Sequence, residues 1–227
     1  MALQKETESA NRSIGEHLRR IMPEALKRDM EVEIRLGHIF DKYTGDRMSI
    51  ETAHPCVITS SESLYFVASV DQSDYCKIVE HFRKKIGEPE SRKIVDTFMN
   101  GCRRSDVKEI DGKTASEKPV IIKKTKVKTV DIYCPENQYD LRVSLSIEAV
   151  KEDTGIHSGG FSVREKDRKT FRCPKYVIDA TKVSSIKQQS EPQVTYEVEI
   201  EVNNSDYIRE EFSDLVVELA DTIKKVL

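Results

Sequence analysis

The chain has 227 residues, and although 34% of them are charged, 37 Lys and Arg against 40 Asp and Glu leave a formal net charge of only −3. This length suits one domain with a sizeable core, and the balanced charge argues against a protein that binds nucleic acid over its whole surface. Five cysteines without a Cys-x-x-Cys pair argue against a zinc site, and no apolar run approaches the roughly 18 residues that span a bilayer, so we expect a soluble intracellular protein without a signal peptide.

The first predicted elements are a helix and a strand. Residues from about 8 to 27 carry apolar side chains at helical spacing, among them Ile14 and Leu18, which predicts an amphipathic opening helix. Alternation of charged and apolar residues over 30–40 then predicts a strand, and a turn that contains Gly45 follows it.

A second helical pattern covers about 72–86 and is closed by Gly87 and Pro89. The chain then shows only strand signals, separated by turn signals such as Asn100-Gly101. The expected strands lie at 93–99, 102–109, 120–133, 139–150, 161–171, 176–183 and 194–202. The last stretch, 205–227, returns to helical spacing and predicts a closing helix.

These elements predict an α+β fold class. Eight antiparallel strands are enough to close a barrel, in which inward and outward residues alternate along every strand. We therefore expect an eight-stranded antiparallel β-barrel with flanking N-terminal, internal and C-terminal helices. Residues 1–28 would form a helix that packs on the barrel, residues 29–227 would form the barrel domain, and the whole would be a single domain.

Two of the expected strands have the same charged pattern. Residues 31–35 read Glu-Val-Glu-Ile-Arg, and residues 197–201 read Glu-Val-Glu-Ile-Glu. Because side chains alternate between the two faces of a strand, five carboxylates can share one side of a sheet: Glu31, Glu33, Glu197, Glu199 and Glu201. Such a cluster would repel itself strongly, and a hard divalent cation with oxygen ligands would relieve the repulsion.

Other strands carry positive charge in the same alternation. Three cations share a face in each of two runs, namely Arg164, Lys166 and Arg168, and Lys124, Lys126 and Lys128. Over 140–148, Arg142, two serines and Glu148 share one face while apolar residues share the other. The apolar face belongs on the core, so the polar face would line a hydrophilic tunnel through the barrel.

A less specific interpretation exists for each of these strands, because charged alternation also marks the solvent face of any amphipathic strand. Five charged strands, some acidic and some basic, instead favour a functional site, since like charges at i and i+2 of a strand are unfavourable without partners of opposite charge. The run 123–128 could also be an exposed basic patch for RNA. The five histidines are scattered without metal-ligand spacing and are expected to be surface or satisfied polar residues.

The chain resembles the metal-dependent RNA 5′-triphosphatases of fungi and protozoa, which belong to the triphosphate tunnel metalloenzymes. The likeness runs from Glu31 to Val202. It is carried by five motifs that agree in order and spacing, at 31–37, 139–148, 164–168, 178–183 and 197–201. One departure is Val177, which stands where this family often has an arginine.

The resemblance implies roles for single residues. The implied metal ligands are Glu31, Glu33, Glu199 and Glu201. The implied phosphate-binding residues are Arg164, Lys166, Arg168, Lys124, Lys126, Arg142 and either Arg103 or Arg104. Catalytic roles fall to Arg164, Lys166 and Arg168 and to Glu148 and Glu199, either of which could orient the attacking water. The implied supporting residues are Arg35, Asp96, Asp179, Thr181 and Glu197.

The resemblance also implies an activity. The expected reaction is hydrolysis of the γ-phosphate of 5′-triphosphate RNA with Mn²⁺ or Mg²⁺, which gives 5′-diphosphate RNA as the first step of mRNA cap formation in the nucleus. The expected partner is a separate RNA guanylyltransferase. Two alternatives remain open at this point: a small-molecule triphosphatase acting on inorganic triphosphate, thiamine triphosphate or a nucleotide, and a triphosphate-binding module without catalysis.

Overall fold

A computed structural model describes residues 13–58, 62–152, 162–186, 191–202 and 209–227. A first helix covers residues 13–21. The later helices are α2 (Gln72–Ile86) and α3 (Arg209–Val226). The strands, in chain order, are β1 (Met30–Asp41), β2 (Cys56–Ile58), β3 (Leu64–Val67), β4 (Glu90–Met99), β5 (Cys102–Ile110), β6 (Lys113–Thr114), β7 (Val120–Tyr133), β8 (Asp140–Lys151), β9 (Ser162–Arg172), β10 (Tyr176–Ile186) and β11 (Gln193–Val202).

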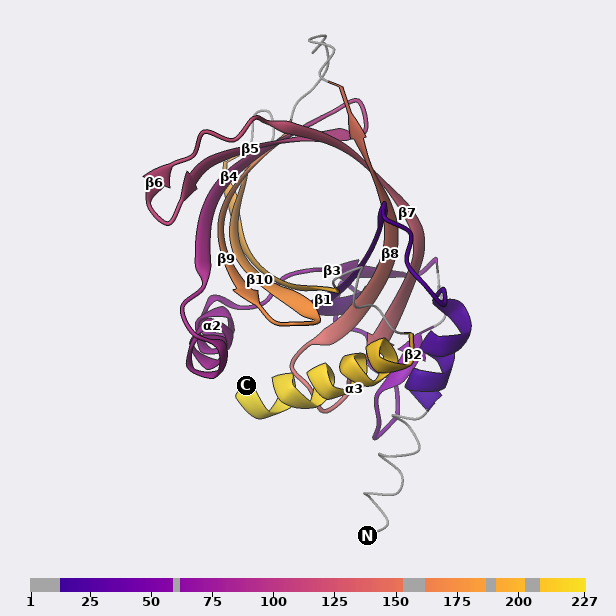
Figure 1. Ribbon diagram of the computed structural model, residues 1–227. Coiled ribbons are helices and arrows are strands. Elements are labelled where there is room, and N and C mark those ends of the chain that lie inside the picture. Colours follow the sequence, from indigo (N-terminus) through magenta and orange to yellow (C-terminus); the bar gives the residue numbers. More distant parts are fainter. Residues whose placement is uncertain (1–12, 59–61, 153–161, 187–190, 203–208) are drawn as a thin grey trace.

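Eight of these strands close into an antiparallel barrel (Figure 1). Its order is β7-β8-β1-β11-β10-β9-β4-β5, and β5 pairs back to β7 through Arg103 and Ile122. The predicted barrel with flanking helices is therefore confirmed. The first helix ends at residue 21, so the predicted opening helix, drawn to about residue 27, extended too far at its C-terminal end. Residues 8–12 and 205–208 of the two predicted terminal helices lie outside the described residues.

Three short strands were not predicted. β2 pairs with β7, β3 with β1 and β6 with β5, and all three lie outside the closed ring. With two to four residues each, they are too short to show a period-2 pattern in the sequence.

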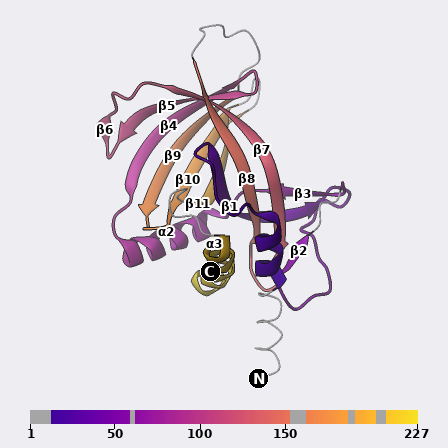
Figure 2. The same cartoon turned by 45° about the vertical axis from the view of Figure 1, so that its right-hand side comes forward.

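The main hydrophobic core lies outside the barrel rather than within it. On β1 and β8 the side chains of Val32, Ile34, Leu141 and Val143 are buried, and they belong to one cluster with apolar residues of the three helices. Figure 2 shows the helices gathered toward one end of the barrel. Because the apolar face of each strand turns outward to the helices, its polar face must turn inward.

A bulge in β7 corrects one predicted face. Pairing with β8 is regular as far as Lys126, opposite Ser146, and then shifts so that Lys128 lies opposite Leu145, a buried core residue. The extra residue moves Lys128 to the face opposite Lys124. The sequence pattern had placed Lys124, Lys126 and Lys128 together, and for Lys128 this was wrong.

An interaction centred on Asp140 fastens the segment after β1 to the barrel. The Asp140 carboxylate is fully buried, and it accepts hydrogen bonds from the backbone N–H groups of Ile39 and Cys134 at 3.0 Å each. The Arg47 guanidinium donates two further bonds to it, at 2.6 and 3.1 Å. A buried carboxylate needs such compensation, since unpaired it would be costly.

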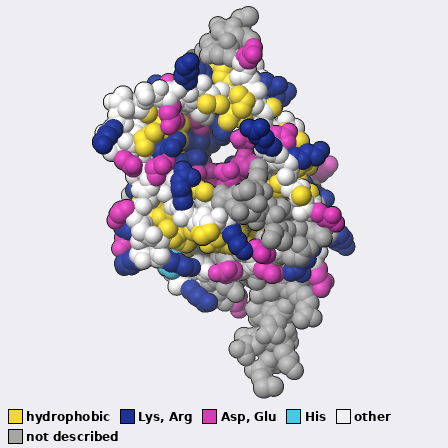
Figure 3. All heavy atoms as spheres, in the orientation of Figure 1, with side chains coloured by type: hydrophobic (Ala, Val, Ile, Leu, Met, Phe, Trp, Pro, Cys, Tyr) yellow, Lys and Arg dark blue, Asp and Glu magenta, His cyan; other side chains and the backbone are white. Residues whose placement is uncertain are grey.

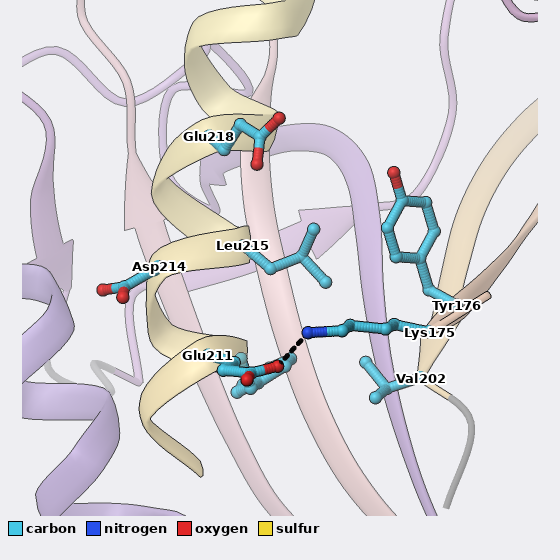
Figure 4. A pocket seen from close by; sticks show the side chains of 8 residues that line it. Lys175, Tyr176, Val202, Glu211, Asp214, Leu215 and Glu218 are labelled. Carbon is cyan, nitrogen blue, oxygen red and sulfur yellow. Dashed lines mark hydrogen bonds and ion pairs between the residues drawn. The ribbon is translucent and has the colours of Figure 1, made fainter. Parts of the chain in front are cut away.

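Helix α3 packs on the barrel near the start of β10. Lys175 reaches across to form an ion pair with Glu211 of α3, and Tyr176, Val202 and Leu215 line a cavity of about 250 Å³ beside it (Figure 4). On its buried side α3 adds Phe212 to the core. In the described part of the chain, no helix combines the length and the apolar character needed to cross a membrane.

Candidate active site

The inside of the barrel holds a cavity of about 120 Å³ whose lining is entirely charged. Seven carboxylates and six cations line it: Glu31, Glu33, Glu148, Asp179, Glu197, Glu199 and Glu201, and Arg35, Arg103, Lys124, Arg164, Lys166 and Arg168. Figure 3 shows acidic and basic side chains facing a hollow that opens on this side of the molecule. All thirteen are among the residues that the sequence singled out.

The two acidic strands lie side by side, as the sequence pattern suggested. β1 and β11 are antiparallel neighbours, with Glu33 opposite Glu201 and Arg35 opposite Glu199. β8 flanks β1 on its other side and brings Glu148, which is paired by register with Lys124 of β7. Three consecutive strands, β11, β1 and β8, thus concentrate carboxylates on one part of the cavity wall.

Lys124 lies among these carboxylates. Its Nζ is 2.9 Å from Glu31 Oε1, 3.2 Å from Glu33 Oε2 and 3.6 Å from Glu148 Oε1. Burial works against the charge of this lysine, but Glu33 and Glu31 outweigh it, and the pKa of Lys124 is raised. One ammonium ion is therefore held by three carboxylates, which identifies this part of the cavity as a position for positive charge.

Arg35 connects the two acidic strands. Its guanidinium is 3.0 Å from Glu33 and 3.1 Å from Glu199. Burial alone would raise the pKa of Glu199, but Arg35 and Arg168 outweigh that effect and hold this pKa below its usual value. Glu199 thus stays ionised and fixes the two guanidinium groups in place.

The basic strand β9 supplies three cations, each held by a carboxylate of another strand. Lys166 Nζ lies 2.6 Å from Asp96 of β4, Arg168 lies 2.7 Å from Asp179 of β10, and Arg164 pairs with Glu197 of β11. The Lys166 side chain is only 8% exposed, and burial lowers its pKa despite Asp96. These contacts fix the direction of the cations without covering them, since all three line the cavity.

Glu201 is the least neutralised of the carboxylates. Removal from bulk water and, next, the nearby Glu31 and Asp179 carboxylates together raise its pKa to about 7. Among the ion pairs of the described residues, none involves Glu201. Burial likewise raises the pKa of Glu31, which faces Glu148. This corner has more negative charge than Lys124 alone can balance.

The raised pKa of Glu201 predicts a pH dependence of folding in the metal-free protein. Its folded-state pKa of about 7 lies above the ordinary value of 4.5, so the folded state binds this proton more tightly. The tighter binding of this proton adds to the free energy of unfolding. This stabilisation is fully present below about pH 4.5 and is lost as the pH rises through about 7. Replacing Glu201 with glutamine should therefore raise the melting temperature at pH 8 and change it little at pH 4.5. Thermal melts in EDTA would measure this, and equal shifts at both pH values would contradict it.

Five of the predicted site residues lie away from the cavity surface. Arg104 points to the face opposite Arg103, so of these two the structure places Arg103 at the cavity. Lys126 is exposed. Asp96 and Thr181 are both buried behind the residues that line the cavity. Asp96 contacts Lys166. Thr181 lies in the strand register between Arg168 of β9 and Glu197 of β11.

Arg142, the fifth, is held beside the cavity by two contacts. Its guanidinium donates to both oxygens of Asp131, at 2.6 and 2.8 Å, and it lies 4.6 Å from the centre of the Phe66 ring. Phe66 can approach because residue 37 is glycine: a Cβ there would come within 2.8 Å of the Phe66 ring and 2.1 Å of the Val67 carbonyl oxygen. Arg142 still lies directly opposite the cavity-lining Arg35.

The sequence did not reveal several partners of these residues. Asp131 fixes Arg142, Ser105 donates a hydrogen bond of 2.6 Å to Asp96, and Thr170 donates one of 2.6 Å to Asp179. Each partner comes from a neighbouring strand, so only the pairing register could have identified it.

The carboxylates suit a divalent cation in their chemistry, since all their donors are hard oxygens. As they lie, no three Asp, Glu, His or Cys side chains of the described residues stand close enough together to bind a metal ion. Lys124 instead lies between the glutamates. The unpaired Glu201 and the raised pKa values of Glu31 and Glu201 show that this corner can take further positive charge.

Comparisons with known proteins agree with this geometry. The chain is 28% identical over 201 residues to the mRNA-capping enzyme subunit beta of Candida albicans, covering 78% of this chain and 38% of that protein. It is 26% identical over 197 residues to the polynucleotide 5′-triphosphatase CTL1 of Saccharomyces cerevisiae, covering 77% and 61%. The chain thus spans about two-fifths to three-fifths of the length of these relatives.

Solved structures share the fold. A structure titled as the S. pombe Pct1 RNA triphosphatase in complex with the Spt5 CTD superposes with a TM-score of 0.75 at 19% identity and covers 95% of this chain and 91% of that one. Residues 6–216 match the family described as the mRNA capping enzyme, beta chain. This match spans most of the chain, which therefore belongs to the mRNA capping enzyme beta chain family.

Proposed function

We propose that this chain hydrolyses the γ-phosphate of 5′-triphosphate RNA with the help of a divalent metal ion, giving 5′-diphosphate RNA and inorganic phosphate. The observation that carries the proposal is the cavity inside the closed barrel, lined only by charged groups of both signs. A triphosphate end is a compact polyanion, and cleaving it requires positioning, neutralisation of the phosphoryl oxygens and an oriented water rather than a covalent intermediate. Membership of the capping enzyme beta chain family supports RNA as the substrate.

In this proposal the basic strand β9 binds the phosphates. Arg164, Lys166 and Arg168 project into the cavity from β9, each oriented by a carboxylate behind it or beside it. Guanidinium and ammonium groups held in this way can bind phosphoryl oxygens without reorganising during the reaction. Arg35, Arg103 and Lys124 would add charge from the other strands.

The acidic strands would hold the metal ion. We assign Glu31, Glu33 and Glu201 as direct ligands and Glu199 as a ligand through water, with Lys124 moving aside when the ion enters. When bound, such an ion acts as a Lewis acid on the phosphoryl group. Manganese and magnesium both suit an all-oxygen ligand set.

Glu148 is the residue we assign to orient the attacking water. Glu199 is held by two guanidinium groups and has a lowered pKa, which makes it a weak base. The ion pairs of Glu148 are longer, at 3.6 Å to Lys124 and to Arg103. In the proposed step the water oxygen bonds to the γ-phosphorus while the bond from this phosphorus to the β–γ bridging oxygen breaks. The bridging oxygen leaves with the 5′-diphosphate RNA, and Glu148 accepts a hydrogen bond from the attacking water.

A side-by-side assay tests the proposal. The purified chain is incubated with Mn²⁺ or Mg²⁺ and equal concentrations of γ-labelled triphosphate RNA, ATP, tripolyphosphate or thiamine triphosphate. We expect phosphate release from RNA with the highest kcat/KM. Turnover confined to the small triphosphates would instead favour a small-molecule triphosphatase, and binding of RNA without phosphate release would favour a capture module.

Membership of the family supports a proposal for the partner and the location. Relatives named as subunits of a capping enzyme support a partner that adds the cap, and we propose a separate RNA guanylyltransferase. We propose the nucleus as the location, since that is where nascent mRNA carries its triphosphate end.

A further inference from the structure

Beyond one end of the charged cavity, the inner face of the barrel carries aliphatic side chains. Ile122 is paired by register with Arg103 on one side and Val150 on the other. Ile122 lies two residues before Lys124 on β7, and Val150 lies two residues after Glu148 on β8, so both share the cavity-facing side of their strands. Val120, opposite Ser105, continues the row. We call Val120, Ile122 and Val150 the aliphatic ledge.

The ledge is open to solvent. Val150 is 74% exposed and Val120 is 42% exposed. By contrast, Val143 and Leu145 of β8 turn outward to the buried core. Exposed β-branched side chains beside a charged cavity therefore need a reason other than folding, because burying them would release ordered water.

The chemistry of the ledge does not suit the phosphates themselves. A triphosphate chain has no apolar surface, and the charged residues already line the space for it. A nucleoside joined to that triphosphate does have an apolar face, formed by the base and the sugar edge, which can pack on aliphatic side chains. The ledge is continuous with the cavity, so one molecule can occupy both.

Charge around the ledge favours a nucleic acid over a mononucleotide. Lys123 and Lys151 belong to the same two strand ends, lie on the opposite face and are exposed. A chain that leaves the cavity across the ledge and bends around these strand ends to the outer face would reach these cations, and its next phosphates would be attracted to them.

We propose that the aliphatic ledge binds the first nucleoside of a 5′-triphosphate RNA and so favours RNA over inorganic triphosphate. This inference rests on the proposed function. The contact adds binding energy remote from the reacting bond, so its loss should appear in the KM for RNA.

The test replaces Val150 with serine. Because Val150 is largely exposed, the variant should fold normally, and its melting temperature would verify this. Steady-state kinetics are measured on a triphosphate RNA oligonucleotide and on tripolyphosphate. We expect the KM for RNA to rise about fivefold, the effect of losing part of one valine contact. The KM for tripolyphosphate should stay near the wild-type value, so the ratio of the two KM values changes.

A matched control is Val194→Ser. Val194 is 50% exposed and lies on the outer side of β11, opposite Ser184. We expect this variant to behave as the wild type on both substrates. The inference is overturned if Val150→Ser leaves both KM values unchanged or raises them by the same factor. A wild-type chain that cleaves tripolyphosphate but not RNA would instead reject the proposed function, so the two failures can be told apart.

Discussion

Replacement of Glu33 with alanine is expected to abolish phosphate release from 5′-triphosphate RNA, with kcat falling by more than about 100-fold. Glu33 is 5% exposed, lies opposite Glu201 and contacts both Lys124 and Arg35. Its loss would remove a central carboxylate from the proposed metal position and release two cations that it orients. Glu199→Ala should have a similar effect, because Glu199 holds Arg35 and Arg168.

A second measurement separates metal binding from catalysis. Mn²⁺ should raise the melting temperature of the wild-type chain, since a ligand that binds only the folded state stabilises it, and Glu33→Gln should lose most of this shift. Glu165→Ala is the matched control, because Glu165 is an exposed glutamate on the outer face of β9. Turnover retained in both Glu33→Ala and Glu199→Ala would refute the metal assignment.

The second large effect is expected for Lys166. Lys166→Ala should lower kcat/KM for triphosphate RNA by about 100-fold, because a preorganised, nearly buried cation contributes strongly to phosphoryl transfer. Lys166 is nearly buried, and Asp96 fixes its ammonium group at 2.6 Å. Arg168→Ala should also reduce activity strongly, since ion pairs with Asp179 and Glu199 hold the Arg168 guanidinium in position for the phosphates.

The control for charge removal is Lys182→Ala. Lys182 is exposed and lies on the outer side of β10, opposite Asp167. Steady-state kinetics on the three variants, with melting temperatures to verify folding, would measure the contrast. If Lys166→Ala and Lys182→Ala reduced kcat/KM equally, the assignment of β9 as the phosphate-binding strand would be wrong.

Within one strand, the sequence was a reliable guide to orientation. Side chains two residues apart share a face whatever the strand pairs with, so the pairs Glu31 and Glu33, and Lys166 and Arg168, could be assigned to one side directly. The same logic separated Leu141 and Val143 on the core side from the polar residues of β8.

Orientation was predicted less well where the backbone leaves the regular period. The bulge after Lys126 carries Lys128 to the other face, and nothing in the surrounding lysine run marks it. The choice between Arg103 and Arg104 depended on the register of a single turn, Asn100-Gly101, where both residues have positive φ angles of 48° and 72°. Turn geometry of this kind sets the register of a hairpin but is weakly encoded by residue type.

The sequence by itself determined the eight main strands and the period-2 separation of charged from apolar faces. Together with the family resemblance it named the residues that line the cavity, except that it left Arg103 and Arg104 as alternatives. Only the tertiary structure decided which charges meet, such as Lys124 among three glutamates, Arg142 beside Asp131 and Phe66, and Glu201 without an ion pair in the described chain. The physical reason is that alternation is a local property of one strand. Pairing register and barrel closure join residues up to about 170 positions apart, such as Glu33 and Glu201, and no local pattern specifies such a contact.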